Sequence, residues 1–190
     1  MHVDKDQTAR RTKMVATLGV MAAISVILLV LGTLISINTA FFTAMAAFLV
    51  GIAVVKYGFG PGTMLFLGCA VLDLILNPEK LHVLLYVAMG GFILVSEGSY
   101  RIFEKRIMDP KKRNLIHLIC RFAFFMAAYC FIVFLLPRLI LSGEAIEQIF
   151  KYDWSTWAML AGGIICFFAF DLAYIFVKRT YLHLFSMKNY

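Results

Sequence analysis

Residues 14–55 read MVATLGVMAAISVILLVLGTLISINTAFFTAMAAFLVGIAVV, and none of these side chains carries a formal charge. A transmembrane helix needs about 20 mostly apolar residues, so the run is long enough for two spans. Its apolar residues are continuous rather than alternating, which favours helices over the strands of a membrane barrel. The polar pair Asn38-Thr39 divides the run, which therefore predicts two consecutive membrane-spanning helices.

The composition extends this interpretation to the whole chain. Of its 190 residues, 62% are hydrophobic and only 15% are charged, against roughly 25% charged in an ordinary soluble domain. A chain with this many apolar residues can fill about six spans. It leaves no stretch long enough for a separate soluble domain. This excludes a soluble enzyme, a disordered chain and a disulfide-stapled secreted domain. The four cysteines lie in apolar runs without metal-ligand spacing, so we expect no metal site.

Charged and helix-breaking residues set the other boundaries. The sequence KYGFGPG at residues 56–62 is dense in glycine and predicts a turn. A basic loop over Glu104–Asn114 separates the fourth helix from the fifth, and Pro137 closes the fifth. The amphipathic segment Ser142–Phe150 is expected to lie at the outer interface or to fold over a pocket as a lid. We predict an all-α, polytopic membrane protein, one domain over residues 1–190, with spans at 14–37, 40–55, 63–76, 82–103, 115–136 and 156–177.

The distribution of basic residues predicts the orientation. The formal net charge is +7, with 18 Lys and Arg. If the N-terminus lies in the cytoplasm, 14 of these 18 fall on inside segments and three on outside segments, while Arg121 lies within a span. Such a bias predicts that both termini are cytoplasmic and that the number of spans is even. The positive charge therefore indicates a multi-pass protein of the cytoplasmic membrane and its lipid bilayer, not a nucleic-acid partner.

Three ionisable residues lie at similar depth in the inner half of the predicted bundle. Glu97 and Asp171 each stand 7 residues before the end of an apolar run, and Arg121 stands 7 residues after the start of one. At 1.5 Å per residue, each lies about 10 Å above the cytoplasmic boundary. The spacing predicts an intramembrane charge cluster. Two interpretations stay open: a structural ion pair, or a coupling or proton-relay cluster.

Polar residues in the outer half form the candidate ligand site. Asp73 and Asn77 share one helix face at i, i+4 spacing, and His82 and Tyr86 share a face on the next helix. Asn38 and Trp154 fall on the same side of the predicted membrane. A buried acid ringed by aromatic and hydrogen-bonding groups suits a small polar ligand. The alternative is an aromatic belt combined with ordinary polarity at helix ends.

No motif indicates catalysis. The chain holds no HExxH, GxSxG, Walker A or GxGxxG sequence, so we expect no enzyme activity, no catalytic residues and no cofactor. Any ATP-driven process would need an ATPase on another chain. Small residues four apart on the first helix, Gly19 and Ala23, allow a close approach to another helix. They predict either intramolecular packing or a docking surface for a membrane partner.

Several features together resemble one transporter family. A basic N-terminus (Arg10-Arg11-Thr12-Lys13) leads into a first helix rich in small residues, and Gly60-Pro61-Gly62 opens the third helix. A basic loop joins the fourth and fifth helices. With about this size and six helices, the chain resembles the substrate-binding S components of energy-coupling factor (ECF) transporters. Gly19-x-x-x-Ala23 stands where that family often has Ala-x-x-x-Ala, a departure that keeps both residues small.

The resemblance implies a specific function. It implies a binder of a vitamin or other small micronutrient, with the ligand in the outer half of the bundle. The chain would work with a separate membrane coupling subunit and two ATPase subunits, and the small face at Gly19 and Ala23 would be the docking surface. Asp73, Asn77, His82 and Trp154 would be the first candidates for ligand contact.

Two other functions fit the same features. The small polytopic scaffold proteins of the rod-shape cell-wall machinery resemble the chain in size and in number of spans, and the glycine-rich turn followed by Leu72-Asp73-Leu74 fits them as well. A self-sufficient small solute carrier would instead use the cluster of Glu97, Arg121 and Asp171. Ligand binding by the purified chain separates the first function from the scaffold, and uptake by the chain alone separates it from the carrier.

Overall fold

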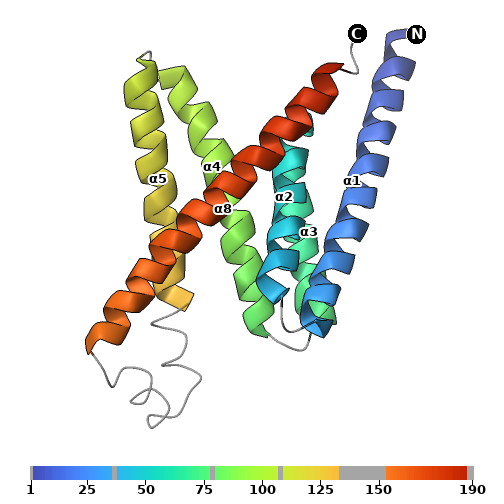
Figure 1. Cartoon of the computed structure of the whole chain (residues 1–190). Coiled ribbons are helices and arrows are strands. Elements are labelled where there is room, and N and C mark those ends of the chain that lie inside the picture. Colours follow the sequence, from blue (N-terminus) through green and yellow to red (C-terminus); the bar gives the residue numbers. More distant parts are fainter. Residues whose placement is uncertain (1, 36–37, 78–79, 107–108, 133–152, 188–190) are drawn as a thin grey trace. The chain divides into compact units, whose positions relative to one another are not determined.

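The protein is all-helical. The computed structural model describes residues 2–35, 38–77, 80–106, 109–132 and 153–187, and these contain no strand. They form two compact units, residues 1–98 and 99–190, and the boundary between the units falls inside a helix at Gly98. The helices are α1 (His2–Leu34), α2 (Thr39–Tyr57), α3 (Phe59–Leu76), α4 (Lys80–Arg106), α5 (Pro110–Cys130) and α8 (Asp153–Met187) (Figure 1).

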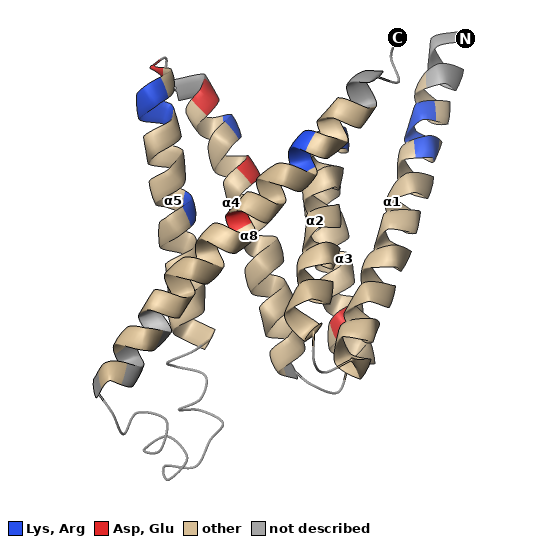
Figure 2. Cartoon of the chain, viewed as in Figure 1, with Lys and Arg blue, Asp and Glu red and all other residues tan. Residues whose placement is uncertain are grey.

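Five stretches of these helices are long and apolar enough to cross a membrane, which fits the predicted multi-pass membrane protein. Figure 2 shows how few charged residues interrupt them. The predicted fifth span, 115–136, begins on α5 but runs past the end of that helix into residues outside the described part. The predicted lid, 142–150, also lies outside the described residues. Six spans and cytoplasmic termini stay predictions. The five stretches are Gln7–Leu34, Thr39–Tyr57, Phe59–Leu76, Leu81–Glu104 and Ala161–Leu184.

The turn between α2 and α3 is much shorter than predicted. Of residues 56–62, only Gly58 lies outside a helix, so the expected extent of this turn is wrong. Gly58 has φ of +102°, a conformation that glycine adopts without a steric penalty, and one such residue reverses the chain. Pro61 lies in the first turn of α3, where a backbone N–H would lack an intrahelical partner anyway.

The basic loop between α4 and α5 is also shorter than predicted. Helix α4 continues to Arg106, and α5 already begins at Pro110. Asp109 caps α5, since its side chain accepts a hydrogen bond of 3.0 Å from the backbone N–H of Lys111. Helix formation does not stop where the apolar run stops, because charged residues are good helix formers outside the membrane.

The first unit is built on α2, which packs against both α1 and α3. Its fully buried apolar residues are Ala46, Ala47, Val50, Ala53 and Val54, which recur at the spacing of one helix face. Their small side chains let the neighbouring helices approach closely, as is common in membrane bundles. On α3, a side chain at Gly62 would collide with Val54, so this glycine allows the closest approach of α3 to α2.

The second unit joins α5 to α8 through aromatic rings. Phe167 of α8 makes edge contacts with Phe122 and Phe125 of α5, with ring centroids 5.2 and 5.4 Å apart. One turn away, Gly163 leaves room for the ring of Tyr129, which a side chain at that position would displace. These ring contacts between α5 and α8 explain why aromatic residues are dense in both helices.

Candidate functional site

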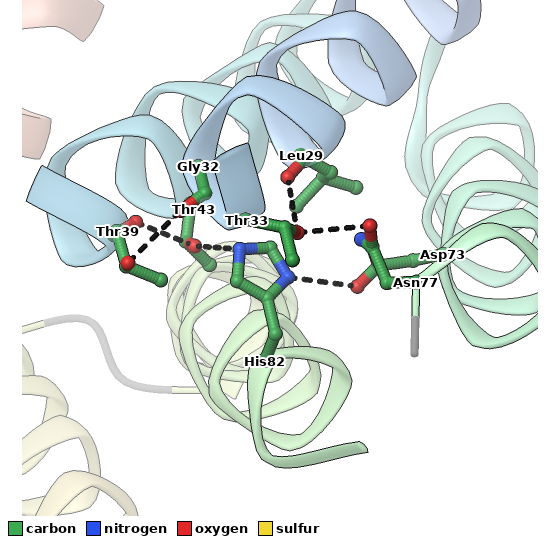
Figure 3. A network of polar contacts seen from close by, with 8 residues as sticks. All are labelled: Leu29, Gly32, Thr33, Thr39, Thr43, Asp73, Asn77 and His82. Atoms are coloured by element: carbon green, nitrogen blue, oxygen red, sulfur yellow. Dashed lines mark hydrogen bonds and ion pairs between the residues drawn. The ribbon is translucent and has the colours of Figure 1, made fainter. Parts of the chain in front are cut away.

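One end of the first unit gathers polar side chains from all four of its helices (Figure 3). Thr33 lies near the end of α1, Thr43 near the start of α2, Asp73 near the end of α3 and His82 near the start of α4. Consecutive helices joined by short connections run antiparallel, which brings these four ends together. Asn77, the residue that follows α3, completes the group. Asp73, Asn77 and His82 are all at most 3% exposed.

The Asp73 carboxylate is the centre of this network. One oxygen, Oδ1, accepts a hydrogen bond from Asn77 Nδ2. The other, Oδ2, lies 3.4 Å from Nδ1 of His82. Asn77 is held in turn by Thr33, whose hydroxyl donates to Asn77 Oδ1 at 2.8 Å. Both carboxylate oxygens therefore have partners, which a buried acid requires if it is not to destabilise the fold.

The second ring nitrogen of His82 faces α2. Nε2 lies 3.3 Å from the hydroxyl of Thr43, which donates its own proton to the carbonyl oxygen of Thr39 at 2.8 Å. Both ring nitrogens therefore face oxygen acceptors. An N–H on either ring nitrogen can therefore donate a hydrogen bond within the network.

Gly32 fixes the position of the imidazole. A Cβ atom at this residue would lie 3.0 Å from His82 Nε2 and 3.2 Å from Cβ of Phe42. The carbonyl of Gly32 accepts a 2.9 Å hydrogen bond from the Thr39 hydroxyl, which ties the end of α1 to the start of α2. The network thus depends on a glycine that leaves space for the ring.

A second polar layer lies one helical turn away from this network. Cys69 stands four residues before Asp73 on α3, and Tyr86 stands four residues after His82 on α4. Ser25 of α1 joins them, since both its hydroxyl and that of Tyr86 lie within reach of the Cys69 thiol. All three residues are fully buried. The thiol is a weak hydrogen-bonding group, so Ser25 Oγ and the Tyr86 hydroxyl are poorly satisfied among the described residues.

Phe66 closes the second layer on one side. Its ring packs against that of Tyr86, with centroids 5.6 Å apart. Gly90, one turn further along α4 from Tyr86, makes this possible, because any side chain there would collide with the Phe66 ring. The second polar layer therefore adjoins the apolar ring of Phe66.

The structure brings together four of the six predicted ligand residues. Asp73, Asn77 and His82 form the network, and Tyr86 lies one turn from it. Asn38 is exposed at the N-cap of α2 and makes no side-chain capping bond. Trp154 belongs to α8 in the second unit, where it is 68% exposed, so its part in the site stays a prediction.

Sequence reasoning missed Thr33, Thr43 and Gly32. The available signal was their position, since all three flank the connection between the two halves of residues 14–55.

The predicted charge cluster is present in part. Arg121 of α5 and Asp171 of α8 form a buried ion pair within the second unit. Glu97 is buried on the part of α4 that belongs to the first unit, and its pairing with Arg121 stays a prediction. Within the described ranges, no group of three or more His, Cys, Asp or Glu side chains could hold a metal ion.

Comparisons of the chain with protein-family models, with curated proteins and with solved structures return no match. The geometry of the polar network and the sequence are therefore the basis for a proposed function.

Proposed function

We propose that the protein is a substrate-binding membrane subunit for the uptake of a vitamin or another small micronutrient, working with separate coupling and ATPase subunits in the cytoplasmic membrane. The observation that carries this proposal is the site in the first unit. A hydrogen-bonded network from four helices adjoins two fully buried hydroxyls, Ser25 Oγ and the Tyr86 hydroxyl, whose polar neighbour is the weakly hydrogen-bonding thiol of Cys69.

Buried hydroxyls that face only a weak thiol partner support a ligand-binding role. A hydroxyl removed from water without a hydrogen bond costs about 1–3 kcal/mol in proteins. Buried polar groups without good partners are therefore uncommon, and a bound molecule or an ordered water can explain them. A small polar ligand would provide partners for both hydroxyls while its apolar part contacts Phe66. The Asp73–His82 pair would set the orientation of that ligand.

The location of the site suits capture of a solute. It lies at the helix ends opposite to the basic start of α1 and to Lys56 at the end of α2. In the predicted orientation, these are the ends nearest the outer surface. A bound solute would enter near the connection of α1 to α2 and that of α3 to α4, without crossing the membrane first.

The first helix offers a surface for a partner subunit. Gly19 and Ala23 are both exposed, and a side chain at Gly19 would meet no atom within 4 Å. A helix face of small residues allows another membrane helix to approach closely. Because the chain carries no ATPase motif, energy for uptake would come through such a partner.

A self-sufficient carrier is the second candidate, and the ion pair of Arg121 with Asp171 favours it. Charged residues inside a membrane segment commonly mark ion or proton pathways. Reconstitution into liposomes separates the two functions. If the purified chain alone takes up a solute without ATPase subunits, the proposal of a substrate-binding subunit is wrong. Binding of the same solute without uptake supports it.

A further inference from the structure

The second unit contains an aromatic ring surrounded by positively charged groups from two other helices. Tyr100, near the end of α4, has the guanidinium of Arg113 over its ring at 5.6 Å from the centroid. The ammonium group of Lys178, on α8, lies at the same distance. The imidazole of His117, one turn after Arg113 on α5, packs edge-on against the ring with centroids 5.6 Å apart. We call Tyr100, Arg113, His117 and Lys178 the Tyr100 cluster.

Basic residues outnumber acidic ones in the sequence around the Tyr100 cluster, which makes the local potential positive. Between residues 101 and 113 there are six basic residues and two acidic ones, Glu104 and Asp109. Glu104 is exposed, and Asp109 is engaged in capping α5. Arg113 also lies in the first turn of α5, where the helix dipole is positive and disfavours cations.

The side chain of Arg113 also has a hydrogen-bond donor that is not satisfied. Its Nε atom is buried and has no hydrogen-bond partner among the described residues. A guanidinium with an unused N–H that shares an aromatic ring with a second cation is suited to an oxyanion, which accepts hydrogen bonds from such groups. The cation–π contacts place the charged groups, but an aromatic face does not neutralise them.

The surroundings of the Tyr100 cluster favour a lipid as the source of this anion. The next turn of α5 exposes large apolar side chains, Leu115 at 59% and Ile119 at 57%. Along α8, Phe176 and Leu172 are 71% and 65% exposed. Tyr100 stands four residues before the end of the apolar stretch of α4, about 6 Å along the helix axis. Cations at this depth, continuous with apolar surface, match a phosphate headgroup with its acyl chains.

We propose that the Tyr100 cluster binds the headgroup phosphate of an anionic phospholipid, with Arg113 and Lys178 as its charged ligands. This site is separate from the polar network of the first unit and does not depend on the function proposed for it.

Native mass spectrometry of the full-length protein tests this proposal. The detergent-solubilised chain is equilibrated with equal amounts of phosphatidylglycerol and phosphatidylcholine that carry the same acyl chains. We expect the wild type to retain phosphatidylglycerol preferentially. Arg113→Gln or Lys178→Gln should each lower that preference about 5-fold, and both together about 30-fold.

Two sets of control variants accompany this test. Lys56→Gln removes a cation that also lies over a tyrosine ring, 5.0 Å from the centroid of Tyr57 in the first unit. It should leave the preference unchanged. Arg113→Lys and Lys178→Arg keep the charges and should retain most of the preference, which guards against a folding defect. An unchanged preference in the double Gln variant overturns the proposal, as does displacement of phosphatidylglycerol by millimolar inorganic phosphate.

Discussion

His82 Nδ1 lies 3.4 Å from Asp73 Oδ2, and this contact joins the end of α3 to the start of α4 through two buried ionisable groups. The two residues are nine apart in sequence. Their pairing keeps a carboxylate and an imidazole in an otherwise apolar interior, where each alone would be unfavourable.

Replacing one partner of this pair should be more harmful than replacing both. Asp73→Asn or His82→Gln leaves the other polar group without its partner, and should lower the free energy of unfolding by about 3 kcal/mol. The double variant should lose clearly less than the sum of the two, because the remaining groups are both neutral. Thermal or denaturant unfolding of the detergent-solubilised protein measures this. Strictly additive losses would show that the two side chains do not interact.

Gly32→Ala should disturb the imidazole without changing any polar group. Its new methyl group would lie 3.0 Å from His82 Nε2, so the ring or α1 must shift, at a cost of about 1–3 kcal/mol. Gly68→Ala is the matched control, since a side chain there meets nothing within 4 Å. Alanine is the better helix former by about 1 kcal/mol, so the control should be neutral or stabilising. Equal effects at both positions would argue against a steric role for Gly32.

Tyr86→Phe should separate stability from ligand binding. The variant removes a buried hydroxyl whose polar neighbour is the weakly hydrogen-bonding thiol of Cys69, so the ligand-free protein should be as stable as the wild type or slightly more so. Binding of the ligand should weaken about 5- to 30-fold, because the ligand loses a hydrogen bond. Unfolding measurements and ligand-retention measurements on the same preparation check both halves. A marked loss of stability without a ligand would mean that the hydroxyl has a structural partner.

The ion pair of Arg121 with Asp171 should behave as a structural unit if the protein is not a self-sufficient carrier. Either single substitution by leucine leaves a buried charge and should destabilise the protein by about 3–5 kcal/mol. Substituting both by leucine should restore most of that stability, because no charge is left buried. Expression level and thermal unfolding report this. A double variant that folds well but abolishes uptake by the chain alone would instead assign the pair to transport.

The sequence predicted those parts of the protein that depend on local patterns. Continuous apolar runs predicted the helices, and i, i+4 spacing correctly indicated that Asp73 and Asn77 share a face. The ends of the helices were harder to predict, because charged residues continue α1 and α8 beyond the apolar runs. In addition, the single residue Gly58 makes the turn between α2 and α3. Thr33 and Thr43 could not be predicted, since they contact Asn77 and His82 across 44 and 39 residues of sequence. Such contacts follow from the packing of four helices, which no single stretch encodes.

The most direct test of the proposed ligand site is mass spectrometry of the small molecules released from the purified protein on denaturation. We expect the wild type to carry a bound polar micronutrient in near-stoichiometric amount. Folded Asp73→Asn and Tyr86→Phe preparations should have lost most of it, while Gly68→Ala should retain it. A wild type that releases nothing after purification from cells supplied with vitamins, or variants that retain the molecule unchanged, would contradict a ligand site at the Asp73–His82 network.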